Sequence, residues 1–149
     1  MNSFSIHKTR HINASPEAVF DVLTSSEHIV RYFPLKQVTS SWHEGGEILL
    51  DGEVDGRAFR DHGVIEILSR PAQFKYRYWS DNHGTEQLPE NCLVIDYRLA
   101  PEQHGTKLTL EQSNIKSGEQ AQRMESMWPH LLDSLAAYVE NKHSRKDAQ

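Results

Sequence analysis

The sequence predicts an α+β fold in which a long C-terminal helix covers one face of a curved antiparallel sheet of about seven strands. Between residues 35 and 114, apolar and polar side chains alternate and turn signals recur, which is typical of antiparallel strands with one buried face. From residue 117 onwards the apolar spacing changes to steps of three and four, the period of an amphipathic helix. Because an apolar sheet face must be covered, we expect this helix to lie across it.

A strand and two short helices are expected before the main part of the sheet. Residues 4–12 alternate as a strand does. Ser15 can cap a helix that begins at Pro16, because a serine hydroxyl accepts a backbone N–H and proline suits the first helical position. A second short helix should begin at Ser26 and end before Pro34.

Asp55-Gly56 predicts the pairing of the first long hairpin, because both residue types favour a two-residue type I′ turn. With that turn, Leu50 lies opposite Asp61. The apolar face then carries Ile48, Leu50, Val54, Phe59, Ile65 and Ile67. Asp61 shares this face, unless a bulge at residues 61–63 turns it to solvent or Arg57 pairs with it.

The remaining strands are expected at residues 74–79, 93–99 and 107–111, with a long loop at 81–91 and a turn at 101–105. Ser117 and Gln120 have the spacing of a capping box at the start of the last helix. Pro129 lies inside that helix and predicts a kink, or a second start capped by Ser126. We expect one domain over residues 1–142 and a frayed tail over 143–149.

Composition excludes several classes of protein. The chain has 149 residues, room for one domain. Its 16 Lys and Arg against 21 Asp and Glu give a net charge of −5 with no basic block, so we expect no nucleic-acid partner. Cys92 alone cannot form an internal disulfide. The apolar runs of the sequence are too short to span a bilayer, and its first residues are polar. We therefore expect no stable membrane insertion and a cytoplasmic location.

The order of several short motifs resembles the SRPBCC superfamily, which includes START domains, polyketide cyclases and birch-pollen allergens. Residues 12–20, followed by Tyr32-Phe33-Pro34, are similar to its opening. Within this superfamily, the chain most resembles one branch, the homologues of the activator of heat-shock-protein-90 ATPase (AHSA-like proteins). The segments that carry this resemblance are Gly45-Gly46, Asp55-Gly56, Gly63 to Ile67, Phe74-Lys75-Tyr76, Gly105 to Leu110, and Trp128 with Leu132 and Leu135.

This resemblance implies a helix-grip fold, with the sheet wrapped around the terminal helix and often a cavity for a hydrophobic small molecule. The branch has no universal catalytic motif, so the resemblance implies the fold and leaves the activity open. Tyr32 stands where the family commonly has tryptophan, which would alter the entrance of the cavity.

The leading hypothesis is a binding protein for a small hydrophobic molecule. A curved sheet cannot touch a straight helix along its whole length, so we expect a gap between them. Buried phenols suit the wall of such a gap, because each needs a partner or water. The residues expected to line it are Phe59, Asp61, Ile65, Tyr76, Tyr78, Tyr97, Leu110, Gln112, Met124 and Trp128, with Asp61 and Gln112 as polar contacts.

Two other functions stay open. Asp61 could be the general base of a cyclase-like or hydrolytic enzyme, which needs a second titratable group, Tyr76 or Tyr97, within about 3 Å. A protein-binding module, such as a co-chaperone acting on a chaperone, would instead show an exposed patch outside the cavity.

Neither a metal nor another cofactor is predicted. The nine histidines are scattered and form no HExxH motif, and Cys-x-x-Cys pairs are absent. Cys92 has no activating neighbour in the sequence, so we expect a half-buried strand thiol rather than a nucleophile.

Overall fold

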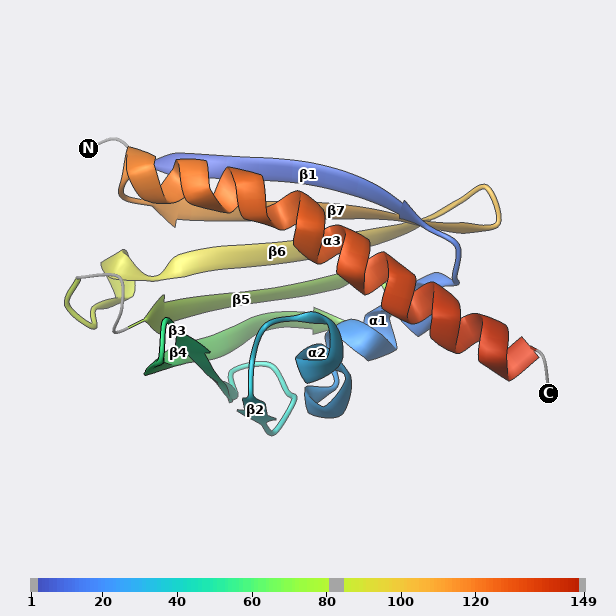
Figure 1. The fold of residues 1–149 in the computed structure, drawn as a ribbon, viewed down its shortest axis with the longest axis horizontal. Coiled ribbons are helices and arrows are strands. Elements are labelled where there is room, and N and C mark those ends of the chain that lie inside the picture. The colour runs from blue at the N-terminus through green and yellow to red at the C-terminus, as the bar shows by residue number, and fades with distance from the viewer. Residues whose placement is uncertain (1–2, 81–84, 148–149) are drawn as a thin grey trace.

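In the computed structural model, which describes residues 3–80 and 85–147, seven strands form one curved antiparallel sheet and a long helix crosses one face of it (Figure 1). Of residues 143–147 only the backbone is described. The strand order is β1-β7-β6-β5-β4-β3-β2, so the first and last strands of the chain are neighbours. This architecture is the predicted helix-grip fold.

The elements follow the predicted order along the chain. They are β1 (Phe4–Ile12), α1 (Pro16–Leu23), α2 (Ser26–Tyr32), β2 (Gln37–Ser40), β3 (Glu47–Val54), β4 (Arg57–Ser69), β5 (Gln73–Ser80), the short 3-10 helix η1 (Pro89–Asn91), β6 (Leu93–Glu102), β7 (Gly105–Ile115) and α3 (Gly118–Asp147). Of the loop expected at 81–91, residues 81–84 lie outside the described part of the chain.

The capping predictions at two helices are confirmed. The Ser15 hydroxyl accepts the backbone N–H of Ala18 at 3.1 Å, and Pro16 is the first residue of α1. At the start of α3, the Ser117 hydroxyl accepts the backbone N–H of Gln120 at 3.3 Å. Each serine satisfies a backbone donor that the first helical turn leaves unpaired.

The β3–β4 hairpin has the predicted turn and register. Asp55 and Gly56 have φ values of 52° and 78°, as a type I′ turn requires, and Leu50 lies opposite Asp61. Pairing is continuous over residues 61–63, so the bulge considered there is absent and Asp61 stays on the inner face.

One apolar position of this hairpin was predicted wrongly. A register shift between Ile65 and Ile67 places Ile67 opposite Lys75, on the outer face, because one extra residue reverses the alternation. Val54 is on the predicted face, because it keeps the alternation of Leu50 and lines the same cavity, but next to the turn it is 52 % exposed.

The last helix is continuous through Pro129, so the predicted second start is wrong. Ser126 caps no new helix, because its hydroxyl donates to the carbonyl oxygen of Gln122 in the preceding turn, at 3.3 Å. The helix continues past residue 142 to Asp147, whereas a frayed tail was expected there, and residues 148–149 lie outside the described part. The domain boundary at 142 stays a prediction.

Helix α3 packs mainly on β1, and its apolar stripe is buried against the sheet. Trp128 is 2 % exposed and Leu135 is 1 % exposed. Helices α1 and α2 pack beside α3 over the other part of the same sheet (Figure 1). The sheet therefore has one covered face, as the alternation predicts.

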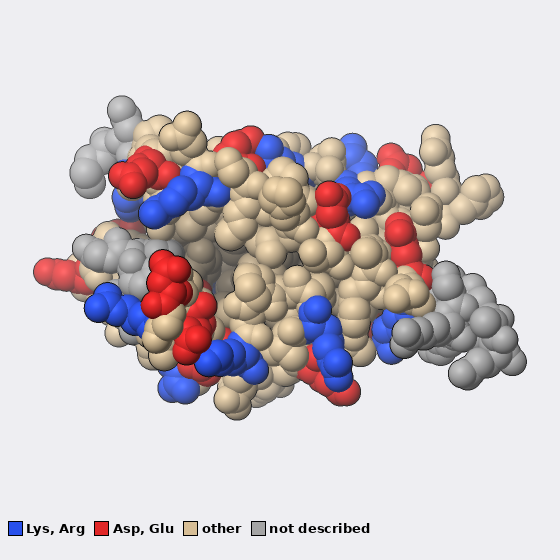
Figure 2. Space-filling view, viewed as in Figure 1, with Lys and Arg blue, Asp and Glu red and all other residues tan. Residues whose placement is uncertain are grey.

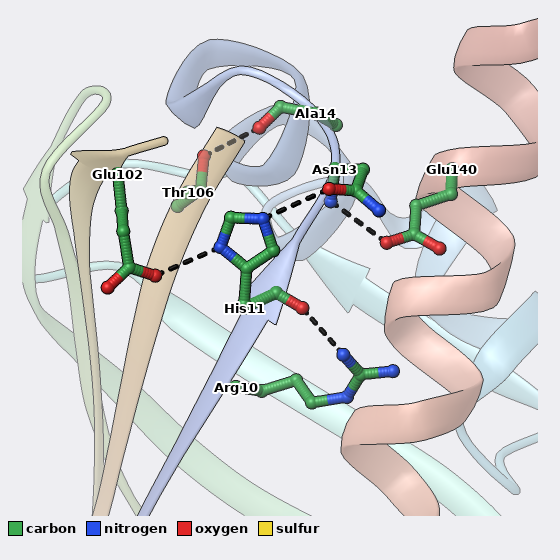
Figure 3. A network of polar contacts seen from close by, with 7 residues as sticks. All are labelled: Arg10, His11, Asn13, Ala14, Glu102, Thr106 and Glu140. Atoms are coloured by element: carbon green, nitrogen blue, oxygen red, sulfur yellow. Dashed lines mark hydrogen bonds and ion pairs between the residues drawn. The ribbon is translucent and has the colours of Figure 1, made fainter. Parts of the chain in front are cut away.

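A polar network joins β1, the β6–β7 turn and α3 beside the start of α1 (Figure 3). The Asn13 backbone N–H donates to a Glu140 carboxylate oxygen at 2.8 Å, and the Thr106 hydroxyl donates to the Ala14 carbonyl at 2.7 Å. The two His11 ring nitrogens face two acceptors, Glu102 Oε2 at 2.9 Å and Asn13 Oδ1 at 3.0 Å. A neutral imidazole can donate to only one of them, whereas an imidazolium donates to both.

The His11 network predicts a pH-dependent contribution to stability. The hydrogen bond to Glu102, with further help from Asn13 and the Glu140 charge, raises the pKa of His11 above 6.5. The stabilisation is therefore full below about pH 6.5 and is lost as the pH rises through the folded-state pKa. We expect His11→Gln to lower the melting temperature at about pH 5.5 more than at about pH 8.5.

Thermal unfolding followed by circular dichroism at both pH values measures this difference. His130→Gln is the matched control, because His130 is an exposed histidine on α3. An equal loss at both pH values for His11→Gln would contradict the charge-dependent contribution.

Candidate functional site

A cavity of about 260 Å³ lies between the sheet, helix α2 and the first half of α3. Figure 2 shows the surface hollowed between α3 and the β3–β4 hairpin. The lining residues are Leu23, Ile29, Tyr32, Phe33, Pro34, Leu35, Ile48, Leu50, Glu53, Val54, Phe59, Asp61, Phe74, Tyr76, Tyr78, Ser80, Ile95, Tyr97, Gln112, Met124, Met127 and Trp128. Most of this wall is hydrocarbon, with a few polar groups among aromatic rings.

Aromatic rings on neighbouring strands form the floor of the cavity. Strand alternation points Phe74, Tyr76 and Tyr78 of β5 inward. The Phe74 ring stacks on Tyr76 at 5.2 Å between centroids and on Tyr97 of β6 at 6.1 Å. Tyr97 meets Trp128 of α3 edge to face at 6.2 Å, so the floor and the helix are in direct ring contact.

Phe59 reaches the cavity because the residue opposite it has no side chain. Gly52 pairs with Phe59 across the β3–β4 hairpin. A Cβ atom on residue 52 would lie 2.6 Å from the Phe59 ring, far inside van der Waals contact. Glycine at this position therefore leaves room for the end of the Phe59 ring over the neighbouring strand.

A chain of buried hydrogen bonds connects α3 to the sheet through Gln112. The Trp128 indole N–H donates to Gln112 Oε1 at 2.7 Å, and the Gln112 amide nitrogen donates to the Tyr78 hydroxyl at 3.1 Å. Gln112 is 1 % exposed. Since a buried amide must have its donors and acceptors satisfied, these two bonds fix the orientation of its side chain and of the indole above it.

The phenols of the cavity remain protonated at neutral pH. Burial is the largest cause that raises the pKa of Tyr32, Tyr76, Tyr78 and Tyr97. The Asp61 charge raises the pKa of Tyr76 and Tyr78 further. These phenols are therefore neutral hydrogen-bonding groups rather than bases.

Eight of the ten residues predicted to line a cavity do so, namely Phe59, Asp61, Tyr76, Tyr78, Tyr97, Gln112, Met124 and Trp128. Ile65 and Leu110 do not, and each is 0 % exposed. Leu110 belongs to β7, next to the strand on which α3 packs, and Ile65 lies beside the bulge of β4 in contact with the segment around Gly46. A role for any of these residues in binding stays a prediction.

Several wall residues were missed by the sequence analysis. Phe74 and Ser80 share the alternation of Tyr76 and Tyr78, so the strand period contained the signal. Leu23 and Ile29 come from the two short helices, whose position over the sheet has no signature in residue spacing. Tyr32, expected at the cavity entrance from its departure from the family pattern, is part of the wall.

The described part of the chain gives no support to a metal site or to a reactive cysteine. No group of three or more His, Cys, Asp or Glu side chains there is placed to hold a metal ion. Cys92 is half-buried just before β6, and burial raises the pKa of its thiol, which disfavours the reactive thiolate. Among the described residues no helix is both long and apolar enough to cross a membrane.

The buried hydrogen bonds of Gln112 predict that its substitution lowers the stability of the protein more than a substitution on the surface does. Gln112→Leu keeps the approximate side-chain volume but leaves the Trp128 indole N–H without its acceptor. We expect the free energy of unfolding to fall by about 1–3 kcal/mol, measured by urea denaturation. Gln122→Leu on the exposed face of α3 should change it by less than about 0.5 kcal/mol. Equal effects of the two substitutions would contradict the structural role of these hydrogen bonds.

Comparison with known proteins agrees with this architecture. A solution structure of ChR145 from Cytophaga hutchinsonii is 30 % identical, with a TM-score of 0.81 over 97 % of this chain and 99 % of that one. CalU16 from Micromonospora echinospora is 22 % identical with a TM-score of 0.72, over 96 % of this chain and 80 % of that one. Ara h 8.0201 shares the fold at 13 % identity and a TM-score of 0.74, over 93 % of this chain and 98 % of that one.

No curated protein matches the sequence. The family described as "Activator of Hsp90 ATPase homolog 1-like protein" matches residues 13–140, which include every element from α1 to β7 and most of α3. The chain therefore belongs to this AHSA-like family, within the SRPBCC superfamily.

Proposed function

We propose that this domain binds a small, largely apolar molecule in the cavity between the sheet and α3. The observation that carries the proposal is the cavity itself, about 260 Å³ with a mainly aromatic and aliphatic wall. Such a volume exceeds the roughly 150 Å³ of a protein cavity that holds benzene, and it lies just below the range of about 300–1,000 Å³ for drug-sized ligands. A ligand of one or two rings matches this space.

The distribution of exposed apolar side chains also supports a ligand site. The large apolar side chains exposed in the described chain are Phe4, Val54, Leu88 and Met127. Val54 and Met127 line the cavity, at the hairpin tip and on α3 respectively. Exposed apolar groups at the opening of an apolar cavity favour the passage of an apolar ligand.

The family description names an ATPase activator, so a chaperone is the alternative partner. Phe4 and Leu88, the exposed apolar residues outside the cavity, belong to different parts of the sequence and neither lines it. Adding the protein to a chaperone ATPase assay distinguishes the two functions, because a ligand-binding domain leaves the ATPase rate unchanged.

A screen of small aromatic, lipid and polyketide-like compounds tests the proposal directly. We expect at least one compound to raise the melting temperature and to form a one-to-one complex in native mass spectrometry. Met124→Trp should lower the affinity for that compound by about ten-fold or more, because Met124 is a half-buried wall residue and the larger indole ring would fill part of the cavity.

Gln122→Trp is the matched control for this substitution. It introduces the same ring on an exposed position of α3 that does not line the cavity, so binding should be retained. If no compound binds, or if both tryptophan variants weaken binding equally, the cavity is not the ligand site.

A further inference from the structure

Two buried tyrosines of the cavity wall carry hydroxyl groups that face the cavity. Tyr76 is 8 % exposed and Tyr97 is 5 % exposed, and both line the cavity. Within the described part of the chain, neither hydroxyl has a hydrogen-bond partner, whereas the Tyr78 hydroxyl accepts a hydrogen bond from the Gln112 amide at 3.1 Å. Neither hydroxyl oxygen is sealed among packed atoms, so both open into the cavity. Because a buried phenol normally has a partner, these two hydroxyls are available to a ligand.

The sheet brings the two hydroxyls to the same side of the cavity. Tyr97 of β6 lies opposite Phe74 of β5, and Tyr76 lies opposite Ile95, so the two tyrosines are diagonal neighbours on the inner face. The Phe74 ring stacks on both, with interplanar angles of 28° to Tyr76 and 14° to Tyr97. Side chains of a strand stand away from the sheet, and diagonal neighbours are within reach of each other when they are aromatic. Both hydroxyls are therefore within reach of one small ligand.

The two phenols are hydrogen-bond donors, and the wall around them favours an uncharged acceptor. Burial raises the pKa of both, so each keeps its proton at neutral pH. A carbonyl oxygen has two lone pairs and accepts from two donors without bringing a donor of its own. A carboxylate is also an acceptor, but the described lining contains no lysine, arginine or histidine to pair with it. Transfer of an unpaired charge into an apolar space is costly, so a neutral acceptor suits this wall better.

We propose that the ligand is an uncharged aromatic carbonyl compound, such as an aryl ketone or a quinone, whose carbonyl oxygen accepts hydrogen bonds from Tyr76 and Tyr97 while its rings pack among the aromatic walls. This inference rests on the proposed function of the cavity and narrows the class of its ligand. It also predicts that hydrocarbons and carboxylates of similar shape bind less tightly.

Three probes with the same pair of phenyl rings test the inference: benzophenone, diphenylmethane and diphenylacetate. Benzophenone has a carbonyl where diphenylmethane has a methylene group, and diphenylacetate carries a carboxylate at that carbon. Their dissociation constants are measured at neutral pH by isothermal titration calorimetry. Without donors in the wall the hydrocarbon would bind more tightly, because a carbonyl loses its hydrogen bonds to water on transfer. We expect instead that benzophenone binds about five-fold more tightly than diphenylmethane and about ten-fold more tightly than diphenylacetate.

Tyr76→Phe and Tyr97→Phe each remove one hydroxyl and keep the ring. Each should lower the affinity for benzophenone about five-fold and change the affinity for diphenylmethane by less than about two-fold. Because neither hydroxyl has a partner in the described part of the protein, both variants should keep the melting temperature of the wild type. Tyr138→Phe is the matched control, since it removes a hydroxyl that bonds to His28 at 2.7 Å and belongs to a residue outside the cavity lining. It should leave both affinities unchanged.

The infrared carbonyl stretch of carbon-13-labelled benzophenone reports the hydrogen bonds directly. Its frequency should be lower in the wild-type complex than in either phenylalanine variant, because hydrogen bonds weaken the C=O bond. If benzophenone binds no more tightly than diphenylmethane, if its preference survives in both variants, or if diphenylacetate binds best, the inference is wrong, while binding of any probe still supports the cavity as a ligand site. If none of the three binds the wild-type protein, both the inference and the proposed function fail. The ranking on the wild-type protein is a sufficient test even if a variant does not fold.

Discussion

The structure depends on the contact between Trp128 of α3 and the sheet. The indole is buried, its N–H donates to Gln112, and its ring meets Tyr97 on β6. A directional hydrogen bond and an edge-to-face ring contact fix the helix at this point far more specifically than apolar burial alone would. Because the sheet curves away on the side of β3 and β4, fixing the helix over β1, β7 and β6 leaves the cavity on the other side.

The same contacts hold the aromatic wall of the cavity in place. The aromatic rings of β5 and β6 stack on one another and on α3, so each ring is held by neighbours before any ligand arrives. Pre-organised apolar walls spare a ligand the entropy cost of ordering side chains. Asp61, Ser80 and Gln112 are among the few polar groups in this otherwise apolar wall, and a small number of polar groups is what usually orients a ligand in such a pocket.

The fold could be predicted from the sequence because its signals are local. Asp55-Gly56 sets the hairpin register through backbone conformation, Ser15 and Ser117 mark two helix starts, and alternation assigns each strand its inner face. The errors were also local. The bulge before Ile67 has no signature in the alternation, and the second helix start considered at Ser126 does not occur, because α3 continues through Pro129.

By itself, the sequence determined that Tyr76, Tyr78 and Gln112 face inward, because strand period acts between neighbours in the chain, whereas the inward position of Asp61 followed only once the pairing over residues 61–63 was known to be continuous. Only the tertiary structure decided which inward residues border empty space. Ile65 and Leu110 have the same pattern as the wall residues, yet they are packed solidly. The difference arises because the path of α3 and the placement of α1 and α2 over a curved sheet result from contacts between distant segments, and residue spacing does not encode those contacts.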